Sequence, residues 1–293
     1  MKKIVTAFFI FFAFTLNFYS NENLEKTARR IVSLGPSATE ILFAINAEDQ
    51  IAARTDLCDY PPEAKKICSV GGFSGSTISL EAILCVEPDL VYLFAGMHDY
   101  LIQPLKNLGI KVFVSDANSI QSVKNEILEI GKITGHQDEA EKVVLQMNLK
   151  IESVHSYVVQ KKTETEKEKE KEKEKERPSV YWEIWNAPLM SAGKNSFIND
   201  IIKYAGGKNI FESEESPYPV VNEEAVILAK PDYIFFTGDG TKAGSVWKKR
   251  KGWNVPDEKI FYVGDDVTFV RPGPRCVLAI EKLAHILWEN QSN

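Results

Sequence analysis

Cysteine and net positive charge are both scarce in this chain of 293 residues. Four cysteines are too few to hold a chain of this length together, which excludes a disulfide-based scaffold. The formal net charge is −6, whereas nucleic-acid-binding domains carry clustered lysine and arginine. With 44% hydrophobic residues, the composition instead indicates a globular chain that has ample material for one large domain or two ordinary ones.

Sequence motifs of common enzyme classes are also missing. The chain has no glycine-rich phosphate loop, no G-x-S-x-G nucleophile elbow and no H-E-x-x-H zinc motif. Its histidines stand singly, as His98, His136, His155 and His285, which gives a tetrahedral zinc site little support. His98 follows a predicted strand end, so it is a candidate metal or ligand contact, with a purely structural role as the alternative. An enzyme site would need a nucleophile–base pair or a metal cluster, and the sequence shows neither, so an exported enzyme that acts in a cleft is kept only as an alternative.

The one long hydrophobic run lies at the amino terminus. Two lysines precede an apolar run from Ile4 to Phe18. This run has the length of a signal-peptide core and falls short of the roughly 20 residues that a membrane-spanning helix needs. We expect residues 1–20 to be a signal peptide, with an uncleaved anchor as the alternative. Because no cysteine follows the run, a lipid anchor is not expected.

Strand-like and helical segments alternate on both sides of a charged middle segment, which predicts α/β lobes with parallel sheets. Six runs are predicted as buried strands, at residues 31–34, 90–94, 111–114, 179–182, 232–236 and 259–263. We expect an amino-terminal lobe at residues 21–137 and a carboxy-terminal lobe at residues 178–293. Residues 138–177 form the inter-lobe helix with its Glu/Lys-rich extension, which we expect to be solvated or to act as a spacer.

An internal repeat relates the two predicted lobes. Residues 79–92 align without gaps on residues 222–235, and each segment is typical of an N-capped helix, a Pro-Asp turn and a buried strand. The alignment places Glu81 and Glu224 at equivalent positions in the first turn of a helix. Complementarity to the helix dipole explains either glutamate on its own. A matched pair of carboxylates that contacts a two-fold symmetric partner is the alternative.

Aromatic residues flanked by proline or glycine indicate loops that are able to line a cleft. Tyr60 precedes two prolines, Phe73 follows two glycines, and Tyr218 lies between two prolines. Further aromatic residues at predicted strand ends or turns are Phe94, Trp185 and Phe269. A core position is the alternative for each of them.

Two further pairs of residues flank loops. Arg271 and Arg275 stand on either side of Pro-Gly-Pro, where they either contact carboxylates, amides or phosphate of a ligand or form surface ion pairs. Cys58 and Cys68 flank the loop that holds Tyr60, and in an oxidising compartment a disulfide between them would stiffen it. Free thiols are the alternative.

Several motifs together resemble the periplasmic cobalamin-binding proteins of ABC importers, within the class III receptors for metal chelates that have a helical backbone. The motifs are RIVSLGPSATE at residues 30–40, DYPPEA at 59–64, VGGF at 70–73, SLE at 79–81 and EPDLV at 87–91. The resemblance extends from Arg30 to Leu287 and is interrupted by the Glu/Lys-rich segment. It implies two Rossmann-like lobes with central parallel sheets, joined by one long backbone helix.

The resemblance also implies a function and a set of site residues. A corrinoid would bind between the lobes as transported ligand, without a cofactor, and a monomeric periplasmic receptor would deliver it to the permease dimer. Haem- and siderophore-binding relatives share most of these motifs, so either ligand is the alternative. Glu81 and Glu224 correspond to the family's docking glutamates, which meet arginines of the membrane subunits. The family's pocket positions correspond to Tyr60, Phe73, Phe94, Trp185, Met190, Tyr218, Phe269 and Arg271.

Overall fold

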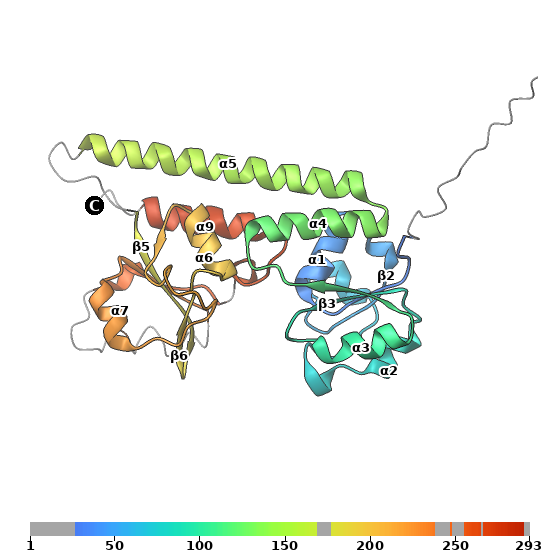
Figure 1. Cartoon of the computed structure of the whole chain (residues 1–293). Helices are drawn as coiled ribbons and strands as arrows, with labels where there is room; N and C mark the ends of the chain where they lie inside the picture. The colour runs from blue at the N-terminus through green and yellow to red at the C-terminus, as the bar shows by residue number, and fades with distance from the viewer. Residues whose placement is uncertain (1–26, 169–176, 238–246, 248–254, 265, 290–293) are drawn as a thin grey trace, which may run out of the picture.

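The computed structural model consists of two α/β lobes joined by one long helix, which confirms the predicted fold class (Figure 1). The structure describes residues 27–168, 177–237, 247, 255–264 and 266–289. The expected signal peptide at residues 1–20 lies outside these ranges, as does the Glu/Lys-rich segment from residue 169 to residue 176. Within the described ranges, no helix is both long enough and apolar enough to cross a membrane.

The amino-terminal lobe contains a four-stranded parallel sheet in the order β2-β1-β3-β4. Strand β2 was not predicted, because its short sequence, IAAR, has little of the β-branched and aromatic character that identifies the other strands. The elements of this lobe are β1 (Ile31–Ser33), α1 (Pro36–Ala44), η1 (Glu48–Gln50), β2 (Ile51–Arg54), η2 (Pro62–Lys66), η3 (Gly75–Thr77), α2 (Leu80–Cys85), β3 (Leu90–Phe94), α3 (Asp99–Asn107), β4 (Lys111–Ser115) and α4 (Ile120–Thr134).

The carboxy-terminal lobe has the sheet order β6-β5-β8-β9, and β7 also pairs with β5. Strands β5, β8 and β9 are parallel, whereas β6 folds back on β5 as an antiparallel hairpin. The three strands predicted here are confirmed, but β6 and β7 were not predicted. The elements are β5 (Ser179–Asn186), β6 (Leu189–Ser191), α6 (Phe197–Tyr204), β7 (Lys208–Asn209), α7 (Glu223–Ala229), β8 (Tyr233–Phe236), η4 (Asp257–Lys259), β9 (Ile260–Tyr262), η5 (Val267–Phe269) and α9 (Cys276–Glu289).

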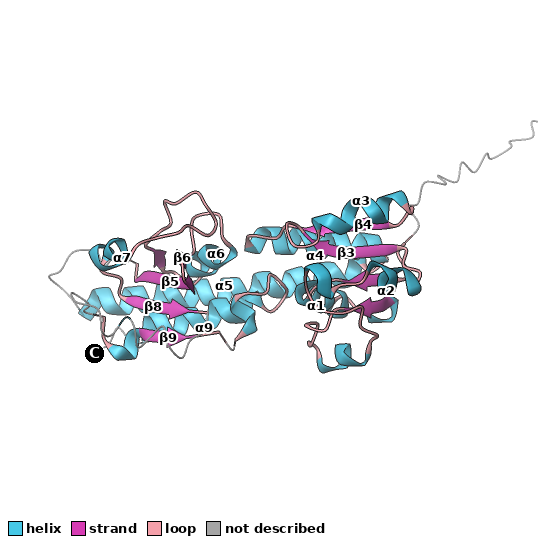
Figure 2. Cartoon of the chain, turned by 90° about the horizontal axis from the view of Figure 1, so that it is seen from below, coloured by secondary structure: helices cyan, strands magenta, loops and turns pink. Residues whose placement is uncertain are grey.

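Helix α5 (Gln137–Glu168) runs along both lobes and packs against α4 and α9. Seen from below, both sheets lie in front of this helical layer (Figure 2). One hydrophobic cluster contains buried residues from both lobes, among them Ile31, Ile127, Met147, Trp182 and Leu283. A shared apolar core opposes movement of one lobe against the other. The domain boundaries at residues 137 and 177 stay a prediction.

The internal repeat is confirmed as a structural repeat. Helix α2 is capped by Ser79, whose hydroxyl accepts a hydrogen bond from the Ala82 N–H at 3.1 Å. Helix α7 is capped in the same way by Asn222, which accepts from the Ala225 N–H at 2.8 Å. Each helix is followed by a strand in the sheet of its own lobe, β3 or β8. The first turns that hold Glu81 and Glu224 are therefore built alike.

A second equivalent pair, Asp89 and Asp232, fixes the start of the neighbouring strand in each lobe. Asp89 accepts from the Arg30 N–H at 3.0 Å, immediately before β1. Asp232 accepts from both the N–H and the hydroxyl of Ser179 at 2.8 Å, at the start of β5. Hydrogen bonds from backbone N–H groups to a carboxylate are strong, so each aspartate links the start of its own strand to the start of the neighbouring parallel strand.

We predict that Asp232→Ala lowers the free energy of unfolding by about 1 kcal/mol, because the Ser179 N–H loses a charged acceptor at an exposed strand end. Urea denaturation measures the change. Asp232→Asn is the matched control, since its side-chain oxygen still accepts a hydrogen bond, and it should lose less stability. Equal stability of the alanine variant and the parent protein would contradict the role given to this aspartate.

Candidate functional site

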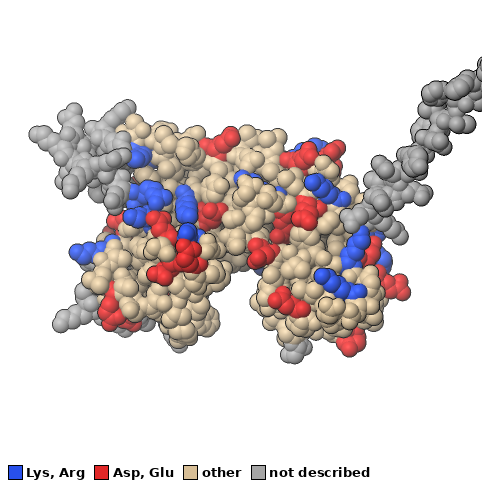
Figure 3. Space-filling model, in the orientation of Figure 1, with Lys and Arg blue, Asp and Glu red and all other residues tan. Residues whose placement is uncertain are grey.

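A cavity of about 750 Å³ lies between the two lobes. In the space-filling view the lobes are separated by a notch that opens on the side away from α5 (Figure 3). Residues that follow β3 and β4 line one side, and residues from the carboxy-terminal lobe line the other. The described lining residues include one carboxylate, Asp116, and no lysine or arginine. Neutral polar groups come from Ser115, Asn118, Asn195 and Thr237.

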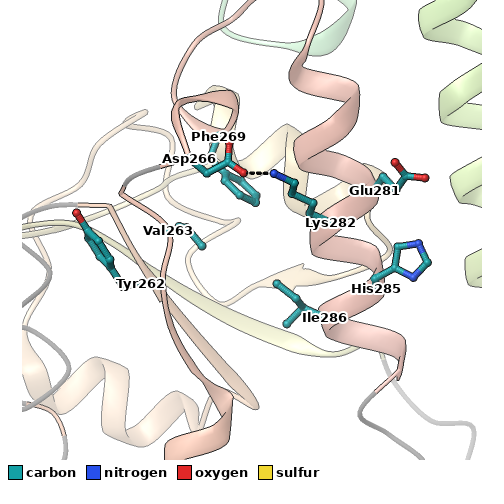
Figure 4. A pocket seen from close by; sticks show the side chains of 8 residues that line it. All are labelled: Tyr262, Val263, Asp266, Phe269, Glu281, Lys282, His285 and Ile286. Carbon is teal, nitrogen blue, oxygen red and sulfur yellow. Dashed lines mark hydrogen bonds and ion pairs between the residues drawn. The ribbon is translucent and has the colours of Figure 1, made fainter.

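A second cavity, of about 510 Å³, lies within the carboxy-terminal lobe between β9 and α9 (Figure 4). Its charged groups are paired within the protein. Lys282 forms an ion pair with Asp266, and Glu281 forms one with Lys150 of α5 at 2.5 Å. Because one lobe alone supplies its lining, this cavity differs from the inter-lobe cleft that the sequence predicts.

Phe94 and Tyr218 are the predicted pocket residues that line the inter-lobe cavity, one from each lobe. Phe94 ends β3, and its ring covers the backbone of Gly35, where an added Cβ would lie 2.1 Å from the ring. Glycine is therefore required before α1 for Phe94 to take this position. The Phe73 ring lies beside it, with ring centroids 6.3 Å apart.

Tyr218 stands on a loop that is hydrogen-bonded to the end of β6 and to the segment that follows it. The carbonyl of Pro217 accepts from the Gly193 N–H at 2.9 Å, and the carbonyl of Pro219 accepts from the Ser191 N–H at 3.1 Å. The prolines predicted to mark a loop therefore also supply its anchoring carbonyls. Burial raises the pKa of the Tyr218 phenol, which keeps the hydroxyl neutral.

Trp185 and Met190 face each other across the β5–β6 hairpin, outside the described lining of the cavity. Trp185 is 54% exposed, and its indole N–H donates to the Ala187 carbonyl at 2.9 Å. Met190 also pairs with Val220, two residues after Tyr218, so the hairpin adjoins the Tyr218 loop. Ligand contact by Trp185 and Met190 stays a prediction.

Burial places two of the candidate residues, Phe269 and His98, in the core and structural roles that the sequence left open as alternatives. Phe269 is 2% exposed and packs its ring 5.4 Å from that of Trp182, so it belongs to the core and to the wall of the second cavity. His98 is fully buried, and both ring nitrogens are hydrogen-bonded, to the Phe94 N–H and to the Phe73 carbonyl. No ring nitrogen is left for a metal. In the part of the chain that the structure describes, no cluster of histidine, cysteine and acidic residues is able to hold a metal ion.

The expected disulfide between Cys58 and Cys68 is not formed. The Cys58 thiol is buried and lies 3.2 Å from the Thr55 hydroxyl. The Cys68 thiol is exposed and forms a hydrogen bond with the Ser69 carbonyl at 3.7 Å. The two thiols thus lie in different environments, one in the core and one at the surface.

Arg271 and Arg275 cross from the carboxy-terminal lobe to Glu40 of α1, in the other lobe. Arg275 donates two hydrogen bonds to the Glu40 carboxylate, at 2.6 and 2.8 Å. Arg271 lies 3.5 Å from the same carboxylate and 2.7 Å from Asp59. The Glu40 side chain is only 3% exposed. Arg271, predicted to contact the ligand, is therefore held in ion pairs between the lobes.

These ion pairs also reach Tyr60. The guanidinium of Arg275 lies 3.5 Å from the centre of the Tyr60 ring, a cation–π contact. Hydrogen bonding to Glu40 raises the pKa of Arg275, and the Arg271 hydrogen bond lowers the pKa of Asp59. The sequence contained a signal for this arrangement in the R-P-G-P-R spacing, but it did not reveal that Glu40 is the shared partner.

Glu81 and Glu224 lie in the first turns of α2 and α7, where both are exposed. The two helices lie on the side of the molecule away from α5 (Figure 1). The backbone N–H of Glu81 and the Ser79 hydroxyl, 2.9 Å away, lower the pKa of the Glu81 carboxyl. Glu81 is consequently ionised at neutral pH.

Two α/β lobes, a backbone helix and an aromatic cavity between the lobes define a two-lobed binding protein. A model of the periplasmic binding protein family matches residues 31–251, and the chain belongs to this family.

Curated relatives cover most of the chain. It is 27% identical over 267 residues to a vitamin B12-binding protein of Photorhabdus laumondii, with 90% of this chain and 89% of the relative covered. It is 30% identical over 290 residues to an uncharacterized ABC transporter substrate-binding lipoprotein of Bacillus subtilis, with 94% and 86% covered.

Solved structures share the fold. A periplasmic vitamin B12 binding protein of Vibrio cholerae superposes with a TM-score of 0.73 at 23% identity, covering 91% of this chain and 99% of that chain. A possible iron-binding protein of Staphylococcus epidermidis gives 0.75 at 26% identity, covering 90% and 100%. A periplasmic heme-binding protein of Roseiflexus gives 0.72 at 21% identity, covering 89% and 98%.

We predict that Glu40→Gln lowers the free energy of unfolding by about 2–4 kcal/mol, because two arginines lose the charge that neutralises them in a buried setting. Thermal and urea denaturation measure the loss. Glu215→Gln, which breaks the exposed Lys194–Glu215 pair, is the control and should change stability far less. A Glu40 variant no less stable than the Glu215 variant would disprove the structural role of the inter-lobe ion pairs.

Proposed function

We propose that this protein is a periplasmic receptor that binds a corrinoid between its lobes and delivers it to an ABC importer. The inter-lobe cavity is the observation that carries the proposal. Its aromatic residues Phe94 and Tyr218 come from opposite lobes and offer flat apolar surface to a large ring. Membership of the periplasmic binding protein family supports the receptor class.

The polar groups of the cavity suit a ligand that carries amides. Asn118 and Thr237 offer neutral donors and acceptors, and a corrinoid has a rim of amide side chains that they would hydrogen-bond. The Ser115 hydroxyl already donates to Glu126 at 2.8 Å, and the Asn195 amide group already donates to the Glu215 carbonyl at 2.8 Å, so from these two side chains the ligand would meet acceptor oxygens. Such groups fix the orientation of a ligand, while the aromatic walls supply most of the buried area.

The charges of the cavity favour a neutral ligand over an anionic one. Ferric siderophores and the propionates of haem are recognised best by lysine or arginine. Arg271 and Arg275, the arginines beside the cleft, are already paired with Glu40 and Asp59. The charged group among the described lining residues is Asp116, which repels anions.

Haem is the second candidate, because Tyr218 brings a phenol into the cavity and a phenolate is a known type of iron ligand. Burial raises the pKa of this phenol and so opposes formation of the phenolate. Because the heme-binding protein of Roseiflexus has the same fold, haem is included among the ligands to be titrated.

Isothermal titration with cyanocobalamin is the test, and we expect a Kd tighter than about 1 μM. Phe94→Ala and Tyr218→Ala should each weaken binding by about tenfold or more, because each removes an aromatic wall. Haemin and a ferric catecholate are titrated in parallel. Binding of haemin without binding of cyanocobalamin would overturn the corrinoid assignment and leave the receptor class in place.

Tyr262→Ala is the matched control for these variants. Tyr262 is an aromatic residue that lines the second cavity, in the carboxy-terminal lobe. Its replacement should leave the affinity for cyanocobalamin unchanged. Loss of affinity in Tyr262→Ala, with none in Phe94→Ala, would move the ligand to the second cavity.

Delivery is proposed to use Glu81 and Glu224, supported by their exposure and by their equivalent places in the structural repeat. A permease dimer has two-fold symmetry, and a receptor monomer with two similar lobes is able to present one carboxylate to each subunit. Exposed charges of this kind act on orientation and association rate more than on affinity. Export by the segment at residues 1–20 belongs to the same proposal.

The double variant Glu81→Ala/Glu224→Ala should abolish ligand uptake in cells and leave ligand affinity within about twofold of the parent, because the two glutamates lie outside the cavity lining. Glu141→Ala/Glu152→Ala is the control. It removes the same charge from exposed positions of α5, on the opposite side of the molecule, and should not affect uptake. Normal uptake by the Glu81/Glu224 variant would refute the docking role.

A further inference from the structure

His98 lies between two phenylalanines at the amino-terminal wall of the cleft. It is the N-cap residue of α3, four residues after Phe94, and its side chain is fully buried. Its ring meets the Phe73 ring edge-on, with centroids 5.6 Å apart and planes at 81°, and the Phe94 ring at 6.2 Å and 74°. Neither the cavity lining nor the proposed function includes this histidine.

The two hydrogen bonds of His98 define one tautomer. The Phe94 N–H donates to Nδ1 at 3.1 Å, so Nδ1 must carry no proton. The Phe73 carbonyl lies 2.7 Å from Nε2 and is able only to accept, so Nε2 must carry the proton. A neutral imidazole with the proton on Nε2 satisfies both partners, and no other protonation state does.

The Phe73 segment depends on α3 for its position. Besides the bond from His98, the Tyr100 hydroxyl of α3 donates to the Gly75 carbonyl at 3.0 Å. The segment closes on itself through the Gly72 N–H, which donates to the Thr77 carbonyl at 2.8 Å. The segment is thus a small closed loop, and the side chains of His98 and Tyr100 connect it to the start of α3.

We propose that His98 is a positioning residue that holds Phe73 and Phe94 together for the ligand and makes ligand affinity fall in acid. If Nδ1 of His98 took up a proton, its N–H would face the backbone N–H of Phe94, and two donors would stand opposite each other without an acceptor. The hydrogen bond from the Phe94 amide would break, and the imidazolium would leave the space between the two rings. The inference rests on the proposed function, because it assigns the ligand to the Phe94 wall.

Burial opposes protonation of His98, so the imidazole takes up its second proton only in acid. Burial lowers the pKa of His98 below 6.5, while the bond to the Phe73 carbonyl and the nearby charge of Asp99 act in the opposite direction. The phenols of Tyr92 and Tyr100 lie on the elements beside it, and burial raises the pKa of both. A histidine whose pKa falls on folding stabilises the folded form above about pH 6.5 and destabilises it as the pH falls below that value.

Titration of cyanocobalamin between pH 7.5 and pH 5 tests the proposal. In the parent protein we expect the affinity to fall about tenfold as the hydrogen bond at Nδ1 is lost. His98→Gln keeps one amide donor and one acceptor, so its affinity should vary much less with pH. His98→Leu should bind weakly throughout. His155→Gln, on exposed α5 surface, should keep the parent profile.

An unchanged pH profile in His98→Gln would overturn the proposal. Failure of cyanocobalamin binding itself would instead contradict the proposed function, so a measurement without ligand is paired with the titration. Nitrogen NMR of the ligand-free protein should show His98 protonated at Nε2, and the Phe73 and Phe94 ring signals should shift as His98 takes up its second proton. If the Phe73 and Phe94 ring signals did not change as His98 is protonated, the proposed coupling between His98 and the two rings would also be refuted.

Discussion

The buried carboxylate of Glu40 constrains the rest of the structure. It belongs to the amino-terminal lobe, but its charge is neutralised by Arg271 and Arg275 of the other lobe. Separating the lobes at this point would leave a charge unpaired in a buried setting, which is costly. The continuous core below α5 adds an apolar constraint in the same direction. The cleft is therefore already shaped in the folded chain, before any ligand enters.

The same ion pairs decide the chemistry of the cleft. Arginines at a ligand site usually mark recognition of anions. Here Arg271 and Arg275 lie between the lobes with carboxylate partners, and Arg275 also supports the Tyr60 ring. What remains on the described cavity walls is aromatic, aliphatic, amide and hydroxyl surface with the single carboxylate of Asp116. Because the arginines are paired with carboxylates in the inter-lobe ion pairs, the cavity itself is almost neutral.

The repeat gives the protein a pseudo-symmetry that serves two purposes. In each lobe a capped helix, a turn and a strand follow the same path, and Asp89 and Asp232 fix the next strand in the same way. This local structure builds both sheets from similar parts. It also leaves Glu81 and Glu224 at matching, exposed positions. The inner walls of the lobes do not follow the symmetry, since Phe94 and Tyr218 come from different kinds of element.

Much of the fold could be predicted from the sequence because hydrophobic periodicity, helix caps and β-branched runs are local properties of the chain. The alternation of strands and helices, the repeat and the helix caps at Ser79 and Asn222 belong to this group. Strands β2, β6 and β7 were missed because they are short and owe their conformation to the strands beside them. The motifs also indicated the class of receptor. Among the predicted pocket residues, Phe94 at a strand end and Tyr218 between two prolines line the cavity, whereas Trp185 at a strand end and Tyr60 before two prolines lie outside its described lining.

Long-range contacts decided what the local sequence left open. Phe269 is as aromatic as Phe94, but its ring packs on Trp182 in the core. His98 follows a strand as a metal ligand often does, but the Phe73 segment, 25 residues away, occupies its second nitrogen. Arg271 and Glu40 are 231 residues apart, so their pairing is invisible in either neighbourhood. The sequence by itself determined which residues were able to bind; the tertiary structure decided which of them already had a partner, because hydrogen-bonding groups and charges are saturated by whatever folding brings beside them.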